Sequence, residues 1–195
     1  MNLIDTLTEK QKQSVRYKHL SKGQILFRED ERCEYIGIVN EGELSIISIL
    51  NNGNNIIYNI IKKDGIFGNN LIFSSNPYYR GGIVATKDSI VGLIYKSDLK
   101  TFLKQNDDFL MMYMEIQSDF GKQLNSRIKL LSIDSARERF MYYLHLNKGV
   151  IRYSSISKLS MELNLQRETL SRIISKLQKD NIIVRDKKTI KAVKE

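Results

Sequence analysis

Short apolar runs alternate with turn residues through the first half of the chain. Six of these runs predict β-strands, at 24–28, 35–40, 43–50, 56–61, 82–86 and 90–95. The segments between runs contain glycine, asparagine or aspartate, which accept the positive φ values of tight turns, at 22–23, 40–42, 51–53, 63–65 and 87–88. This regular spacing predicts an antiparallel sandwich or barrel.

The hydrophobic period then changes to alternating steps of four and three residues. The seam consists of Leu110, Met114, Gln117, Gly121, Leu124, Ile128 and Leu131. It predicts a helix over about 109–132 that pairs with a second copy of the chain, and the small glycine and polar glutamine suit a close pair in one register. A long helix that packs on its own domain fits the same pattern, and this alternative stays open.

A shorter helix is predicted after the long one. Residues 132–135 form the expected hinge. The helix then runs through Arg137, Phe140, Leu144 and Leu146 to a break at Lys148-Gly149. The chain after the hinge therefore begins a second, helical domain.

Two further helices joined by a sharp turn are predicted next. Ser155 can cap a helix over 156–163, and Asn164 follows where a positive φ is needed, a conformation that asparagine tolerates well. Leu165 is the apolar residue of the turn, and the second helix runs from Arg167 to about residue 180. The apolar and small positions at which the helices cross are Leu159, Ser160, Leu163, Leu170, Ile173, Ile174 and Leu177. This pattern predicts a helix-turn-helix.

The exposed edge of the second helix carries residues suited to reading DNA bases. Arg167 and Arg172 can each donate two hydrogen bonds to guanine, Glu168 can accept from cytosine, and Ser171 can bond a base or a phosphate. Thr169 lies between them. The alternative is a solvated helix with an ion pair between Glu168 and Arg172.

A basic hairpin is predicted at the end of the chain. Two apolar runs, 182–185 and 189–193, flank the turn Asp186-Lys187-Lys188. With the preceding helices, this hairpin makes a winged helix-turn-helix in which Lys187 and Lys188 can contact a phosphate backbone. A hairpin whose lysines serve only solubility would look similar.

The charge distribution supports a polyanionic partner for the second part of the chain. The net charge is +9, but residues 1–132 carry 17 Lys/Arg against 15 Asp/Glu, whereas residues 133–195 carry 14 against 7. A basic excess confined to one segment is typical of nucleic-acid binding through phosphate contacts.

Several classes of function are disfavoured by composition. With one cysteine, Cys33, the chain can form no internal disulfide and no cysteine-ligated metal cluster, and a buried, inert thiol is expected. His19 and His145 are the only histidines, and no carboxylate pair lies in an apolar context, so we expect no enzyme, no metal and no cofactor. Without a signal peptide or a membrane-length apolar run, a soluble, cytoplasmic protein is expected.

Over nearly its whole length the sequence resembles the bacterial Crp/Fnr family of transcription regulators, named after the cyclic AMP receptor protein and the fumarate-nitrate reductase regulator. The motifs that carry the resemblance are KGQILF at 22–27, VNEGEL at 39–44, DGIFG at 64–68, ATKDS at 85–89, SARERF at 135–140 and RETLSR at 167–172. The resemblance implies an α+β fold: a cyclic-nucleotide-binding-like β-roll over 1–106, a dimerisation helix and hinge over 107–134, and a winged helix-turn-helix over 135–195. It also implies a homodimer that binds an inverted-repeat operator, with a half-site containing TGA.

The sensor segment departs from the family pattern. Cyclic-nucleotide binders have a glutamate after the glycine and an arginine after the proline of this segment, where the chain has Asn69 and Tyr78 within FGNNLIFSSNPYYRGG at 67–82. The resemblance therefore predicts no tight cyclic AMP binding. Arg80, two residues late, could replace the arginine only if the loop is longer than usual. The residues that the family's effector pocket would contain are Asn69, Asn70, Leu71, Tyr78, Tyr79, Arg80, Leu124 and Asn125.

The expected partners are double-stranded DNA and a second copy of the chain, with RNA polymerase and a small-molecule effector as further candidates and no membrane. A regulatory protein that acts through a protein partner instead of DNA is the alternative. Steep loss of DNA affinity with added salt is expected only of the DNA-binding regulator.

Overall fold

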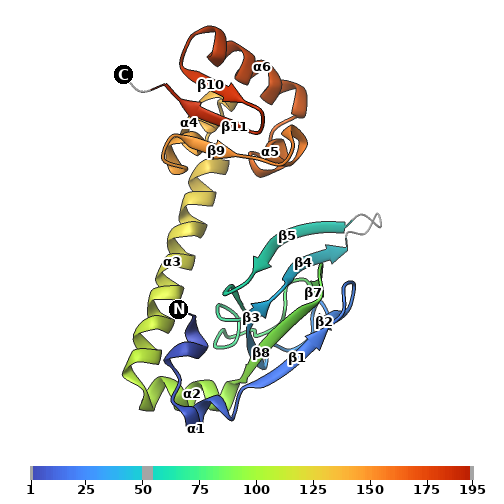
Figure 1. The fold of residues 1–195 in the computed structure, drawn as a ribbon, viewed down its shortest axis with the longest axis vertical. Coiled ribbons are helices and arrows are strands. Elements are labelled where there is room, and N and C mark those ends of the chain that lie inside the picture. The colour runs from blue at the N-terminus through green and yellow to red at the C-terminus, as the bar shows by residue number, and fades with distance from the viewer. Residues whose placement is uncertain (1, 50–54, 194–195) are drawn as a thin grey trace. The chain divides into compact units, whose positions relative to one another are not determined.

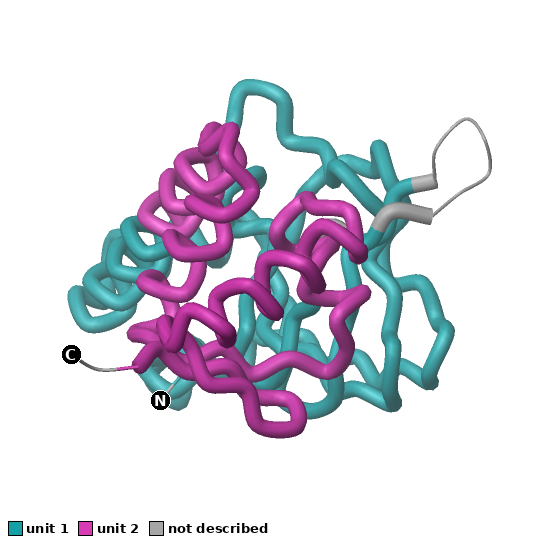
Figure 2. The backbone as a smooth tube through the Cα atoms, turned by 90° about the horizontal axis from the view of Figure 1, so that it is seen from above, with its two compact units in different colours: residues 1–119 teal, residues 120–195 magenta. Residues whose placement is uncertain are grey.

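A computed structural model of the chain describes residues 2–49 and 55–193. It contains two compact units, Met1–Asp119 and Phe120–Glu195 (Figures 1 and 2). The boundary falls inside the long helix α3 (Asp107–Leu131), so each unit contains about half of this helix. The expected division into 1–106, 107–134 and 135–195 stays a prediction.

The first unit is built on two four-stranded antiparallel sheets, which confirms the predicted β-domain (Figure 1). In sheet order, the strands of one are β1 (Arg16–Leu20), β8 (Ser89–Tyr95), β3 (Tyr35–Glu41) and β6 (Ile66–Phe67). Those of the other are β2 (Ile25–Phe27), β7 (Gly82–Ala85), β4 (Glu43–Ile49) and β5 (Asn55–Lys62).

All six predicted strands are present, with small differences at their ends. Leu50 and the predicted turn at 51–53 lie outside the described residues. Strands β1 and β6 were not predicted, because β1 exposes four of its five residues and β6 has only two residues. Pairing with β8 and β3, rather than an alternating apolar pattern, makes these segments strands.

The core of the first unit lies between the two sheets. Strand β3 has four consecutive buried residues, Ile36 to Val39, and on β8 Val91, Gly92, Leu93 and Ile94 are buried in the same way. Aromatic rings fill the middle, where Phe27 stacks on Tyr79 with ring centroids 4.7 Å apart. Cys33 is buried as expected, and this burial raises the pKa of its thiol and keeps the group in its neutral, unreactive form.

Short helices complete the first unit. They are η1 (Leu3–Thr6), α1 (Glu9–Lys12) and α2 (Lys96–Gln105). Asn2 caps η1 by accepting hydrogen bonds from the amides of Ile4 and Asp5, and α2 buries Leu99 and Phe102. The ring of Phe102 meets the fully buried Phe109 of α3 edge to face, with centroids 5.7 Å apart. This contact attaches the first half of α3 to its own domain.

The second unit has three more helices and a three-stranded sheet. The helices are α4 (Ala136–Leu146), α5 (Ile156–Glu162) and α6 (Arg167–Lys179), and the strands, in sheet order, are β10 (Ile183–Asp186), β11 (Thr189–Ala192) and β9 (Val150–Arg152). The predicted helices and hairpin are confirmed, whereas β9 was not predicted. The core residues are Leu130, Phe140, Leu144, Ile151, Leu159, Leu163, Leu170, Ile174, Leu177, Ile183 and Ile190. Among the described residues, no helix is long and apolar enough to cross a membrane.

Candidate functional site

The turn between α5 and α6 has the geometry that its residues predict. Asn164 has a φ of 49°, in the left-handed region where asparagine is tolerated. The amide of Leu165 donates to the carbonyl of Ser160 at 2.9 Å, and the Ser155 hydroxyl accepts from the amide of Lys158 at 3.1 Å. Because Ser160 is small and buried, the two helices can cross closely, and α6 has a fixed direction relative to α5.

Helix α6 buries one face and exposes the predicted reading face. Leu170, Ile174 and Leu177 are buried, and the exposed residues are Arg167, Glu168, Ser171 and Arg172, with Thr169 half-buried. Of these described side chains, Glu168 and Arg172 form no ion pair with each other, and Arg172 donates a long hydrogen bond of 3.5 Å to the hydroxyl of Thr169. The Arg172 guanidinium therefore keeps most of its donors for a partner molecule.

Arg139 is a positioning residue whose function sequence reasoning did not identify. Its guanidinium donates to the carbonyls of Ile133 at 2.9 and 2.6 Å, Leu163 at 3.3 Å and Asn164 at 3.0 Å. These bonds connect the predicted hinge to the turn before α6. Its place in the SARERF motif was the available signal, but the carbonyls it contacts are up to 25 residues away.

The end of α5 is held by two side chains from other helices. The guanidinium of Arg127 donates to the carbonyl of Glu162, and the Tyr143 hydroxyl donates to the Glu162 carboxylate at 2.7 Å. Burial of Tyr143, together with this carboxylate, raises the pKa of its hydroxyl to about 12. The first helix of the motif is thus attached to both α3 and α4 within the second unit.

Tyr153 fixes the hairpin of β10 and β11. Its amide donates to the carbonyl of Lys188 at 3.0 Å, its hydroxyl donates to the carbonyl of Lys187 at 3.2 Å, and the same hydroxyl accepts from Nε of Arg185 at 2.7 Å. The side chains of Lys187 and Lys188 are exposed at the turn. Because three hydrogen bonds to Tyr153 hold the hairpin, these two ammonium groups extend from a fixed point.

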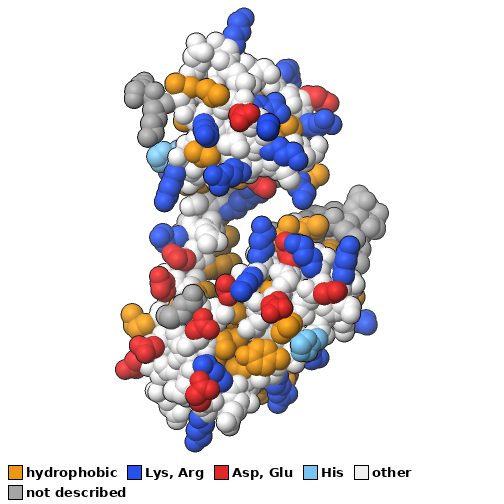
Figure 3. Space-filling model, viewed as in Figure 1, with side chains coloured by type: hydrophobic (Ala, Val, Ile, Leu, Met, Phe, Trp, Pro, Cys, Tyr) orange, Lys and Arg blue, Asp and Glu red, His pale blue; other side chains and the backbone are white. Residues whose placement is uncertain are grey.

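Positive charge is concentrated on the second unit, which carries 17 Lys/Arg against 7 Asp/Glu. The first unit carries 14 against 15. In Figure 3, basic side chains are scattered over the visible face of residues 120–195 with few acidic ones among them, whereas acidic and basic groups are mixed over residues 1–119. The unit that contains the helix-turn-helix therefore presents a surface suited to a polyanion.

In the sensor segment, Asn69 forms hydrogen bonds within its own unit. It is only 4% exposed, and its side-chain amide donates to Oε1 of Gln117 at 2.5 Å. Its backbone carbonyl accepts from Nε2 of Gln117 at 2.9 Å and from the hydroxyl of Tyr113 at 3.0 Å. Burial raises the pKa of the Tyr113 hydroxyl to about 12, so this donor keeps its proton. Gln117, predicted as a seam residue, is thereby bonded to the sensor segment of its own chain.

The other predicted effector residues lie in different surroundings. Tyr79 is buried, its ring stacks on Phe27 and its hydroxyl donates to the carbonyl of Tyr35 at 2.9 Å, so its participation in an effector pocket stays a prediction. Exposed side chains are those of Asn70, Tyr78, Arg80, Leu124 and Asn125, and Leu71 is half-buried. Leu124 and Asn125 belong to the second unit, and their participation in an effector pocket stays a prediction.

The remaining seam residues of α3 are largely exposed. Met114 is 53% exposed, Leu124 50%, Ile128 55% and Leu131 41%, and a Cβ added at Gly121 would meet no atom within 4 Å. Leu110 is half-buried. Exposing an apolar row of this kind to water is costly. Pairing of the helix with a second copy of the chain therefore stays the prediction.

Comparisons with known proteins agree with this geometry. Residues 17–106 match the family described as the cyclic nucleotide-binding domain. The chain is 25% identical over 165 residues to the anaerobic regulatory protein of Bacillus subtilis (strain 168), covering 85% of this chain but only 61% of that protein.

Two solved structures illustrate the similarity of the fold. A mutant of CooA from Carboxydothermus hydrogenoformans superposes with a TM-score of 0.72 at 17% identity, covering 98% of this chain and 91% of that one. The catabolite activator protein of Thermus thermophilus superposes with a TM-score of 0.57 at 16% identity, covering 98% and 93%. The likeness of the fold thus extends through both units.

Proposed function

We propose that this chain belongs to the Crp/Fnr family of transcription regulators and is a sequence-specific DNA-binding protein and not an enzyme. The observation that carries the proposal is the exposed edge of α6, where Arg167, Glu168 and Arg172 stand on a helix fixed by the turn at Asn164. In a helix-turn-helix, this edge enters the major groove and contacts bases. The lysines of the hairpin then contact phosphates beside it.

We propose that the chain forms a dimer with two-fold symmetry, which requires an inverted repeat as its DNA site. The exposed apolar row on α3 pairs two copies, and each copy brings one α6 to the DNA. The two half-sites then lie one helical turn apart, roughly 34 Å. RNA polymerase is a further candidate partner of such a complex.

Selection of bound sequences from a random DNA pool tests the DNA-binding function directly. We expect an inverted repeat to emerge, and we expect affinity for it to fall steeply with added salt because each phosphate contact releases counterions. Scrambled DNA of equal length is the control for non-specific binding. A regulator that acts only through a protein partner would enrich no motif, and that outcome would refute the proposal.

The sensor domain, we further propose, does not bind cyclic AMP tightly. Asn69 and Tyr78 provide neither the carboxylate for a ribose hydroxyl nor the guanidinium for a cyclic phosphate, and a buried anion without a partner is costly. Asn69 is in addition bonded to Gln117. A nucleotide would have to break these hydrogen bonds, and the protein provides no charged group at positions 69 and 78 to compensate its phosphate.

Calorimetry of the full chain with cyclic AMP is expected to give no binding in the submicromolar range. The Gln117→Ala variant, which frees the Asn69 side chain, should behave in the same way because the charged groups are still missing. A submicromolar dissociation constant would contradict this prediction. In that case, loss of binding in Arg80→Ala would identify Arg80 as the replacement for the missing guanidinium.

A further inference from the structure

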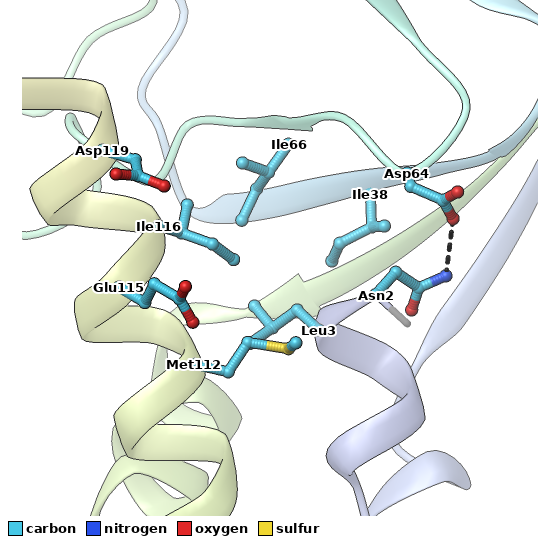
Figure 4. Close-up of a pocket in the computed structure, with 9 residues that line it drawn as sticks. All are labelled: Asn2, Leu3, Ile38, Asp64, Ile66, Met112, Glu115, Ile116 and Asp119. Carbon is cyan, nitrogen blue, oxygen red and sulfur yellow. Dashed lines mark hydrogen bonds between the residues drawn. The ribbon is translucent and has the colours of Figure 1, made fainter. Parts of the chain in front are cut away.

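A small cavity lies within the first unit between η1, β3, β6 and α3 (Figure 4). Its volume is about 250 Å³. The lining residues are Asn2, Leu3, Ile38, Asp64, Ile66, Met112, Glu115, Ile116 and Asp119. None of the described sensor residues from Asn69 to Arg80 lines it, so this cavity is separate from the segment where the family's effector would bind.

The floor of the cavity is apolar. Leu3 and Ile38 are buried, and the half-buried side chains of Ile66, Met112 and Ile116 pack against the same core. These five side chains come from four different elements, and Figure 4 shows them grouped around a common space. A ligand with an aliphatic chain would remove its own apolar surface and theirs from water.

The rim of the cavity is acidic. Asp64, Glu115 and Asp119 line it, and Figure 4 shows Glu115 extending from α3 toward the space between the lining residues. Nδ2 of Asn2 donates to Asp64 at 3.0 Å and connects the start of the chain to this side of the cavity. Lys, Arg and His are absent from the described lining residues, although the chain as a whole has a net charge of +9. The local charge therefore favours a cationic ligand.

The spacing of the carboxylates disfavours a metal ion. In the described parts of the chain, no three His, Cys, Asp or Glu side chains lie close enough together to hold one. A compact divalent cation needs several oxygens converging on a single point. An extended organic cation needs only one carboxylate near its charged end and an apolar surface for the rest of the molecule.

We propose that this cavity binds a small aliphatic ammonium compound, with the alkyl chain against Leu3, Ile38 and Ile116 and the ammonium group near Glu115. The volume is below the range typical of drug-sized ligands, which limits the ligand to a short chain. The proposal does not depend on DNA binding, since the cavity lies wholly within the first unit.

Calorimetry of the full chain with n-hexylamine, 1-hexanol and hexanoate tests whether the ligand needs both a positive charge and an alkyl chain. We expect saturable one-to-one binding of n-hexylamine, weaker binding of the neutral alcohol and no binding of the anion. Shortening the amine from hexyl to pentyl and to butyl should weaken binding by about fourfold per methylene, because each group leaves the apolar floor.

Two matched variants locate the site. Glu115→Gln should weaken n-hexylamine binding by up to about fivefold, which is the range of an exposed ion pair. Glu34→Gln removes the same charge from an exposed position outside the cavity and should leave n-hexylamine binding unchanged. Circular dichroism checks that both variants are folded. The proposal is overturned if n-hexylamine fails to bind at concentrations on the order of 10 mM, if hexanol binds equally well, or if both variants have the same effect.

Discussion

Replacing Arg172 with alanine is expected to weaken binding to the selected operator by about 1 to 3 kcal/mol for each lost bidentate contact with guanine. The change in base preference should be confined to one position in each half-site, where the preference for guanine disappears. Arg172 is exposed on α6 and alanine is a strong helix former, so the fold of the variant should be unchanged. Binding-site selection with the wild-type chain and the variant, run side by side, measures both effects.

Lys188→Ala is the matched control for this experiment. Removing a phosphate contact should lower the affinity for all DNA sequences about equally. It should also reduce the salt dependence of that affinity by about one released counterion. Lys188 is exposed at the turn of the hairpin, and its φ lies outside the left-handed region in which Lys187 has a φ of 46°. If Arg172→Ala selects the same motif as the wild-type chain, α6 does not read bases through this residue and the proposed orientation is wrong.

Glutamate at both Leu124 and Ile128 is expected to convert the dimer to a monomer. The two side chains are about half exposed in the single chain, so the change should cost the isolated fold little. In the pair, four apolar side chains would be lost from the interface and four like charges brought together, which should weaken association by on the order of 6 kcal/mol or more. Sedimentation equilibrium at micromolar concentration measures the change.

Gln123→Glu is the control, since it adds a negative charge to the same helix at an exposed position outside the seam. This variant should remain a dimer and bind the inverted repeat like the wild-type chain. The double variant should retain only the weak binding of a single half-site. A monomeric wild-type chain, or a double variant that still dimerises, would show that α3 packs only against its own domain.

The helix-turn-helix could be predicted because its signals are local. A positive φ at Asn164, a cap at Ser155 and buried leucines spaced three or four residues apart all depend on a few neighbouring residues. The same holds for the strands that have turn residues at both ends. Strands β1, β6 and β9 were missed because their identity depends on pairing with distant segments.

The family resemblance located the sensor segment, but only the tertiary structure showed what its residues contact. Gln117 fits a heptad position by spacing, yet its amide is bonded to Asn69, 48 residues earlier. Tyr79 is one of the predicted effector residues, and its ring packs in the core against Phe27. A periodic pattern shows which face of an element a residue is on and leaves open which segment meets that face.

The amino-acid sequence by itself determined six strands of the first unit, the long helix, the turn before α6 and the exposed arginines on that helix. The tertiary structure alone decided which carbonyls Arg139 contacts and which side chains from η1, β3, β6 and α3 surround one cavity. The physical reason is the range of the interactions. Backbone conformation and helix periodicity are set within a few residues, whereas a cavity or a buried hydrogen-bond network forms only when segments far apart in the chain pack together.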